Sequence, residues 1–162
     1  MDPLKQLRRI RIWLIIFVIG LVLSGVTAFP LLTEIRLISE LPVPGFAVPW
    51  LDRVRAGLEA TGRDYPFLFY GTDWLAFAHI VIGLAFIGPY RDPVRNIWVV
   101  QWAMLCCVAV VPLALIAGPI RGIPWWWQLA DISFGVFGII PLWIVYRHIK
   151  ALSSGGELAS RG

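Results

Sequence analysis

The run IWLIIFVIGLVLSGVTAFPLLT, residues 12–33, contains 22 consecutive residues without a charged side chain. A helix needs about 20 mostly apolar residues to cross the hydrocarbon core of a bilayer. A signal peptide has a shorter apolar core and an Ala-x-Ala-like cleavage site. The run therefore predicts a membrane span.

The composition of the whole chain agrees with this prediction. Apolar residues make up 59% of the 162 residues and charged residues only 15%, whereas soluble domains carry about 25% charged residues. A chain of this length has room for a few spans and no separate soluble domain. We expect an all-α membrane protein with a single transmembrane domain over residues 1–152.

Four stretches are long and apolar enough to span: residues 12–29, 72–89, 96–117 and 125–146. The nine tryptophans support this division, because all lie near a predicted span end or in the long loop. Indole rings favour the boundary between water and lipid. The sequence thus predicts a bundle of four transmembrane helices.

The basic residues predict the orientation of the spans. With the N-terminus inside, the inner segments hold nine Lys and Arg residues: Lys5, Arg8, Arg9, Arg11, Arg91, Arg95, Arg147, Lys150 and Arg161. The outer segments hold five: Arg36, Arg53, Arg55, Arg63 and Arg121. Because cytoplasmic loops are enriched in positive charge, both termini are expected in the cytoplasm.

The outer loop, residues 31–71, is too long for a simple connection. Residues 33–41 and 49–60 have the pattern of two short amphipathic helices, separated by the breaker Pro42-Val43-Pro44-Gly45. We expect these helices on the outer membrane surface or over the bundle. The tail, residues 153–162, is polar and Gly/Ser-rich, which predicts disorder.

The other two links, residues 91–96 and 118–124, are short, so the second, third and fourth spans should be antiparallel neighbours. Their Gly and Pro residues indicate tight turns. Pro112 and Pro141 lie inside spans, where each is able to kink its helix.

Asp73, His79 and Asp131 lie inside otherwise apolar spans. Ionisable groups in lipid cost several kcal/mol unless they are paired or hydrated, so they indicate function by default. Helical spacing places polar and small residues together on one face of each of two spans. On the second span this face contains Asp73, Ala76, His79 and Gly83, and on the fourth span it contains Gln128, Asp131, Gly135 and Gly138.

Such faces should point into the bundle, because small residues allow helices to approach closely. Gly20 and Ser24 give the first span a similar face, and Ala103, Cys107 and Ala114 do so for the third. The predicted polar pocket lies in the outer half of the membrane and contains Asp73, His79, Asp131, Arg121 and Gln128.

A purely structural interpretation accounts for the same residues. Asp73 suits the first turn of a helix, Asp131 suits a buried pair with Arg121, and His79 suits a hydrogen bond between helices. Cys106 and Cys107 are adjacent, so they resemble small apolar residues more than a redox motif. We expect no cofactor, and in particular no haem, since His79 lies in the outer half of the membrane and His148 at the inner end of the fourth span. We expect no metal site either, since Asp73, His79 and Asp131 lack the close spacing of metal ligands.

The run Tyr70-Gly71-Thr72-Asp73-Trp74-Leu75-Ala76-Phe77-Ala78-His79 and the two short links resemble an uncharacterised family of small bacterial inner-membrane proteins. The likeness covers about residues 29–146. It implies a bacterial source and a multi-pass location in the cytoplasmic (inner) membrane, and it implies no activity.

Three functional classes follow from these observations. The first is a non-enzymatic accessory, sensing or scaffold component whose partners are membrane lipids and itself or a larger complex, with no nucleic acid. The second is a proton- or ion-linked transporter that uses Asp73, His79 and Asp131. The third is a membrane enzyme acting on a lipid or quinone, with His79 and Asp73 as its acid–base pair.

Overall fold

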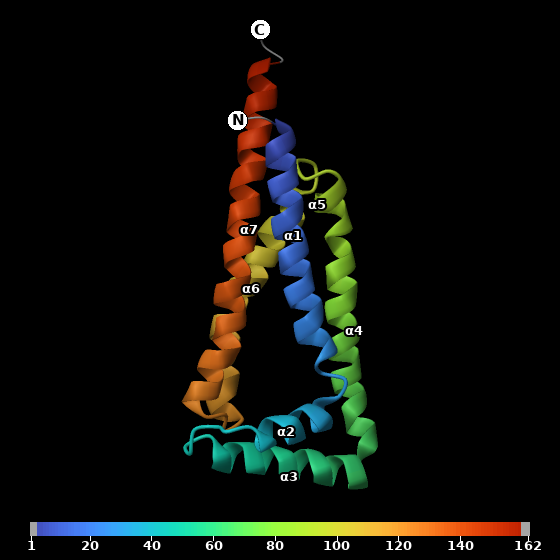
Figure 1. Cartoon of the computed structure of the whole chain (residues 1–162), viewed down its shortest axis with the longest axis vertical. Coiled ribbons are helices and arrows are strands. Elements are labelled where there is room, and N and C mark those ends of the chain that lie inside the picture. The colour runs from blue at the N-terminus through green and yellow to red at the C-terminus, as the bar shows by residue number, and fades with distance from the viewer. Residues whose placement is uncertain (1–2, 160–162) are drawn as a thin grey trace. The chain divides into compact units, whose positions relative to one another are not determined.

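The computed structural model describes the backbone of residues 3–159 and the side chains of residues 3–154. The fold is all-helical, with 86% helix and no strand in the described chain. Its elements are α1 (Pro3–Val26), α2 (Leu31–Glu40), α3 (Val48–Asp64), η1 (Pro66–Phe69), α4 (Tyr70–Ala85), α5 (Ile87–Arg91), α6 (Ile97–Ile120) and α7 (Trp125–Ala159) (Figure 1).

Four helical segments of the described chain are long and apolar enough to cross a membrane: Pro3–Val26, Pro66–Arg91, Ile97–Ile120 and Trp125–Ser154. This confirms four candidate spans. Their limits differ from the prediction: the first helix begins nine residues earlier than residue 12 and ends at Val26 rather than at residue 29, whereas the other three helices end beyond their predicted spans. The first helix begins at Pro3, where the missing N–H of proline costs nothing in the first turn.

Contacts divide the chain into two compact units. One unit contains residues 1–20 and 83–162, and the other contains residues 21–82. We call them the hairpin unit and the loop unit, and each is described separately. The prediction of a single transmembrane domain stays a prediction.

The hairpin unit is built on the antiparallel contact of α6 with α7, the most extensive helix pairing in the described chain (Figure 1). Six residues in the described part of α7 are buried: Gln128, Gly135, Pro141, Leu142, Val145 and Ile149. Four of them, at positions 128, 135, 142 and 149, are spaced seven residues apart. A seven-residue repeat is the signature of coiled-coil packing. Both helices continue through their internal prolines, Pro112 and Pro141.

Small residues set the spacing of this hairpin. A Cβ atom at Gly135 would overlap the carbonyl oxygen of Cys107, and one at Gly138 would lie 3.1 Å from the Cys107 sulfur. The prediction that these residues face inward is therefore confirmed. The same prediction for Gly20 is wrong, because Gly20 is exposed and no heavy atom lies within 4 Å of its Cβ position.

The turn between α6 and α7 satisfies the free carbonyls at the end of α6. Ile123 N–H donates to the Gly118 carbonyl at 2.9 Å, and Gly122 N–H donates to the Pro119 carbonyl at 3.1 Å. These bonds form a Schellman motif, which needs a left-handed residue after the helix. Gly122 supplies it with a φ of 66°.

The link between α5 and α6 is also a hydrogen-bonded turn. Asp92 Oδ1 accepts the backbone N–H of Arg95 at 3.0 Å. Asn96 Nδ2 donates to the carbonyls of Gly88 and Asp92 at 3.3 and 2.9 Å. The interpretation of residues 91–96 and 118–124 as tight turns is therefore confirmed.

Pro89 explains why the fourth and fifth helices are separate. Proline cannot donate to the carbonyl four residues earlier, and its ring clashes with that carbonyl. The carbonyl concerned is that of Ala85, which is the residue where α4 ends. Phe86 fills the break and is buried, with its ring 5.1 Å from that of Phe17.

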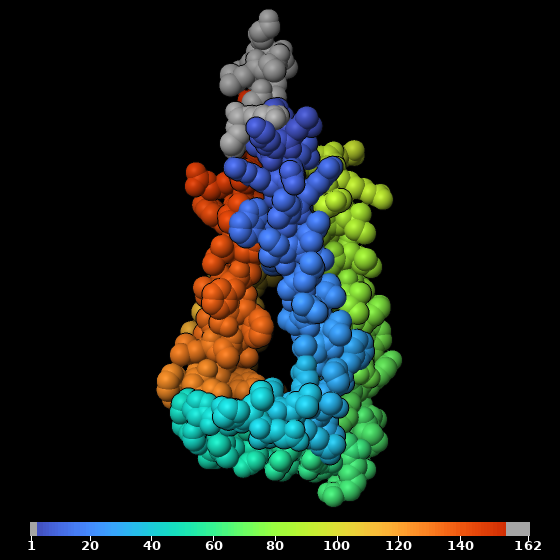
Figure 2. Space-filling view, viewed as in Figure 1, coloured from blue at the N-terminus to red at the C-terminus, as the bar shows by residue number. Residues whose placement is uncertain are grey.

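In the loop unit, α2 and α3 pack against each other, as the cyan and teal atoms of Figure 2 show. Ile35 and Leu51 are buried. Arg36 Nη2 lies 3.1 Å from Glu59 Oε1, and the Arg36 Nε also donates to that oxygen. Leu37 of α2 is exposed, and so are Leu41 and Phe46 of the link between the two helices.

At the end of the chain, α7 extends to Ala159. Ser153 and Ser154 donate their hydroxyls to the Lys150 carbonyl within this helix, at 2.9 and 3.0 Å. The predicted disorder of residues 153–162 stays a prediction. Residues 160–162 lie outside the described chain.

Candidate functional site

The five candidate residues fall into both units. Asp73 and His79 belong to α4 of the loop unit, whereas Arg121, Gln128 and Asp131 belong to the hairpin unit. Each group is therefore described within its own unit, and the complete predicted pocket stays a prediction.

Asp73 is half-buried in the first turn of α4. Backbone N–H groups at a helix N-terminus favour a negative charge there. Ala76 on the same face is fully buried, which places this side of α4 inside the protein. The position of Asp73 therefore matches the structural interpretation of this residue.

His79 is half-buried, and its Nδ1 lies 2.8 Å from the Leu75 carbonyl of the same helix. A carbonyl only accepts, so Nδ1 carries the hydrogen in this bond. The bond stays within α4 and does not connect two helices. No hydrogen bond joins His79 to Asp73 in the described structure, so the acid–base pair of the enzyme hypothesis is not formed.

His79 is held by a close approach of α1. A Cβ atom at Gly25 would overlap the Cβ of His79 and lie 2.5 Å from its Cγ. The helices can be this close only because position 25 has no side chain. The sequence analysis did not identify Gly25 as a contact residue. The available signal was its position next to Ser24, which belongs to the predicted inward face of the first span.

Gln128 is buried and has a structural partner. Its Nε2 donates to the Ile123 carbonyl at 2.8 Å. Its side chain occupies the space beside Gly118, where an added Cβ would lie 2.5 Å from Gln128 Cδ. Gln128 therefore anchors the α6–α7 turn.

Asp131 lies on the same face of α7, between Gln128 and Gly135, and is half-buried. Among the described residues it makes no hydrogen bond and no ion pair. The ion pair with Arg121 is therefore not formed. Arg121 is the exposed C-cap of α6. Its guanidinium can therefore stay hydrated, and an exposed ion pair gains little free energy over two separately hydrated charges.

The described chain contains no cluster of three His, Cys, Asp or Glu side chains that would suit a metal ion. The ion pairs of the described chain are Arg36–Glu59, Arg55–Asp52 and Arg63–Asp64, all in the loop unit. Asp131 is therefore the chemically unusual group of the hairpin unit, because a carboxylate on a helix seam normally has a partner.

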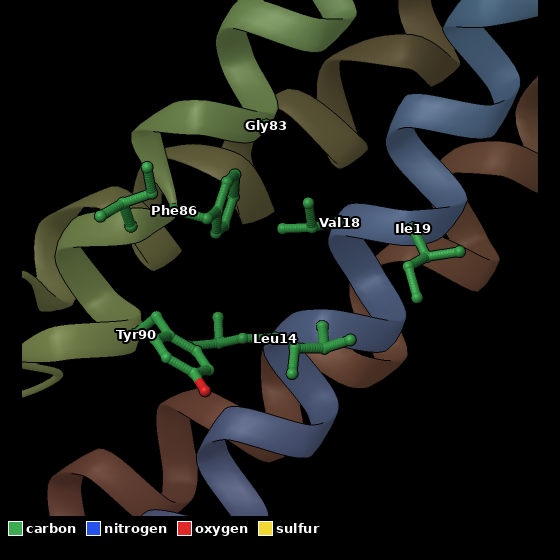
Figure 3. A pocket seen from close by; sticks show the side chains of 8 residues that line it. Leu14, Val18, Ile19, Gly83, Phe86 and Tyr90 are labelled. Atoms are coloured by element: carbon green, nitrogen blue, oxygen red, sulfur yellow. The ribbon is translucent and has the colours of Figure 1, made fainter.

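The structure also contains an apolar groove that the sequence analysis missed. We call it the Leu14 groove; its volume is about 180 Å³ (Figure 3). From α1 it is lined by Leu14, Ile15, Val18 and Ile19. From the end of α4 and from α5 it is lined by Gly83, Phe86, Ile87 and Tyr90. Two residues in the sequence could have indicated this groove: Gly83, which has no side chain to fill it, and Pro89, which causes α4 to end.

Comparison of the chain with protein-family models, with curated proteins and with solved structures gives no match. The resemblance stated from the sequence therefore stays a prediction.

Proposed function

We propose that this chain is a multi-pass protein of the bacterial inner membrane with both termini in the cytoplasm. Four helices of sufficient length and apolar character support the membrane location. The excess of Lys and Arg on one side supports the orientation. In this orientation α2 and α3 lie at the outer surface, where Leu37, Leu41 and Phe46 contact the lipid boundary.

Cysteine labelling tests the orientation. In a background with Cys106 and Cys107 replaced by Ala, Gly57→Cys should react with a membrane-impermeant maleimide in intact spheroplasts. Gly57 suits this label because no heavy atom lies within 4 Å of its Cβ position. Lys5→Cys should react only after the membrane is opened. The opposite pattern would contradict the orientation.

Within this membrane we propose a non-enzymatic accessory, sensing or scaffold role. The observation that carries it is the pairing of α6 with α7. The small-residue seam of α6 faces α7. The other side of α6 exposes Leu105, Leu113 and Ile116, so it remains free for lipid or for another membrane protein.

Site-specific photo-crosslinking in native membranes tests this role. A photoreactive residue at Leu113 should give one discrete adduct, either a dimer of this chain or a single larger partner. The same residue at Val100, which is buried, should give none. Adducts with lipid alone from Leu105, Leu113 and Ile116 would contradict a scaffold role.

A proton- or ion-linked transporter is the second candidate. It is favoured because Asp131 has no hydrogen bond and no ion pair with any described residue. In this proposal Asp73, His79 and Asp131 line an outward-facing pocket and Asp131 titrates. The test compares wild type with Asp131→Asn in pH-jump assays on proteoliposomes. Loss of pH-driven flux at unchanged protein yield supports transport. A large loss of yield without a change in flux would contradict it.

A further inference from the structure

The Leu14 groove has a buried apolar floor and open rims. Leu14 and Phe86, which form the floor, are 1% and 2% exposed. Ile15 and Ile87 at the rims are 44% and 48% exposed. The six residues from Leu14 to Ile19 are separated by five helical rises, which give the groove a length of about 8 Å along α1. Such a slot suits several methylene groups of one acyl chain.

One end of the groove is charged. Figure 3 shows Tyr90 beside Leu14, and Gly83 towards the Val18 end. At the Tyr90 end, Arg11 Nε donates to the Tyr90 carbonyl at 3.2 Å, and the Arg11 guanidinium carbon lies 5.2 Å from the centre of the Tyr90 ring. These two contacts fix the guanidinium about one turn before the groove begins.

The terminal nitrogens of Arg11 have no carboxylate partner. Ion pairs in the described chain involve only Arg36, Arg55 and Arg63. Arg8, one turn earlier on α1, and Arg91, next to Tyr90, are also exposed and form no ion pair with a described carboxylate. A positioned guanidinium with free N–H donors is well suited to a phosphate.

We propose that the Leu14 groove binds one anionic phospholipid, with an acyl chain between α1 and α5 and its phosphate on Arg11. A phospholipid combines the two properties that the site requires, since its anionic headgroup lies next to its apolar chain. The proposal needs only the membrane location and does not depend on the accessory role.

The test is lipid retention measured by native mass spectrometry of the full chain. The protein is taken from nanodiscs of phosphatidylglycerol or of phosphatidylcholine. Wild type should retain one phosphatidylglycerol and clearly less phosphatidylcholine. Arg11→Gln should reduce phosphatidylglycerol retention about fivefold. This factor corresponds to the usual contribution of one basic residue to binding at an anionic membrane surface. The substitution should reduce phosphatidylcholine retention by less, because the choline group of that lipid already neutralises its phosphate.

Matched variants separate this site from general attraction to lipid. Ile15→Trp should fill the groove and reduce retention of both lipids. Ile16→Trp is the control, because Ile16 is adjacent and 49% exposed but does not line the groove. Arg147→Gln removes a charge from an exposed position on α7 and should change nothing.

Three results would overturn the proposal: equal retention of the two lipids by wild type, equal effects of Arg11→Gln and Arg147→Gln, or equal effects of Ile15→Trp and Ile16→Trp. If Ile15→Trp does not give monodisperse protein, Ile87→Trp blocks the opposite rim and replaces it. Failure of lipid binding with correct cysteine labelling would leave the proposed membrane orientation intact.

Discussion

The side chain of Gln128 occupies the space that a side chain at position 118 would need. It packs on Gly118 and also donates a 2.8 Å hydrogen bond to the Ile123 carbonyl. One residue thus connects the start of α7, the end of α6 and the turn between them.

Gly118→Ala should destabilise the hairpin by about 1–3 kcal/mol, the usual cost of overpacking. The new Cβ would lie 2.5 Å from Gln128 Cδ, so Gln128 must move and lose its bond to Ile123. Thermal unfolding in detergent measures the effect. Gly20→Ala is the control, because its Cβ position is open, and it should leave the melting temperature unchanged or raised. Equal melting temperatures for the two variants would contradict the role of Gln128.

Gly135→Ala should destabilise the protein more than Gly118→Ala. The added Cβ meets the backbone oxygen of Cys107, which cannot rotate away as a side chain can. The two helices must separate, which weakens packing along the whole seam. The same unfolding experiment ranks the variants. A smaller loss at 135 than at 118 would show that the backbones are not in close contact.

Gly25→Ala should also destabilise the protein, because the new Cβ meets the Cβ of His79. Adding His79→Ala should not restore stability, since alanine keeps that Cβ. Adding His79→Gly should restore part of it, reduced by about 1 kcal/mol for glycine within a helix. This double-mutant cycle separates contact with the Cβ from contact with the imidazole ring. Equal recovery with both second substitutions would assign the clash to the ring.

Gly122→Ala should cost about 1–2 kcal/mol, because a φ of 66° is unfavourable for a residue with a Cβ. Gly122→Asn should cost less, since asparagine tolerates this conformation better. Gly71→Ala is the matched control; its Cβ position is open and its φ is not positive. Chemical unfolding in detergent gives the order expected, with Ala at 122 the least stable of the three.

Hydropathy and small-residue periodicity predicted the spans and the α6–α7 seam, because both depend on local sequence. Gly135 and Gly138 could be assigned to the seam from spacing alone. The missing pair of Arg121 and Asp131 could not be foreseen, since spacing along the chain does not show whether a guanidinium at a helix end stays with solvent. The Leu14 groove was equally hidden. It depends on the break that Pro89 causes and on residues of α1 about 70 positions away in the sequence.

The Schellman turn at Gly122 has a consequence for the order of assembly. It joins two helices that are neighbours in sequence, so their contacts close a short loop and form quickly. Phe17 contacts Phe86 and lies against the Gly138 position, so these contacts of α1 join residues from opposite ends of the chain. The contact of Phe17 with Gly138 can therefore form only after α7 has been synthesised, whereas its contact with Phe86 needs no residue of α6 or α7. The first helix thus closes its contacts with the hairpin unit in two steps, and the step that joins it to the α6–α7 hairpin is the later one.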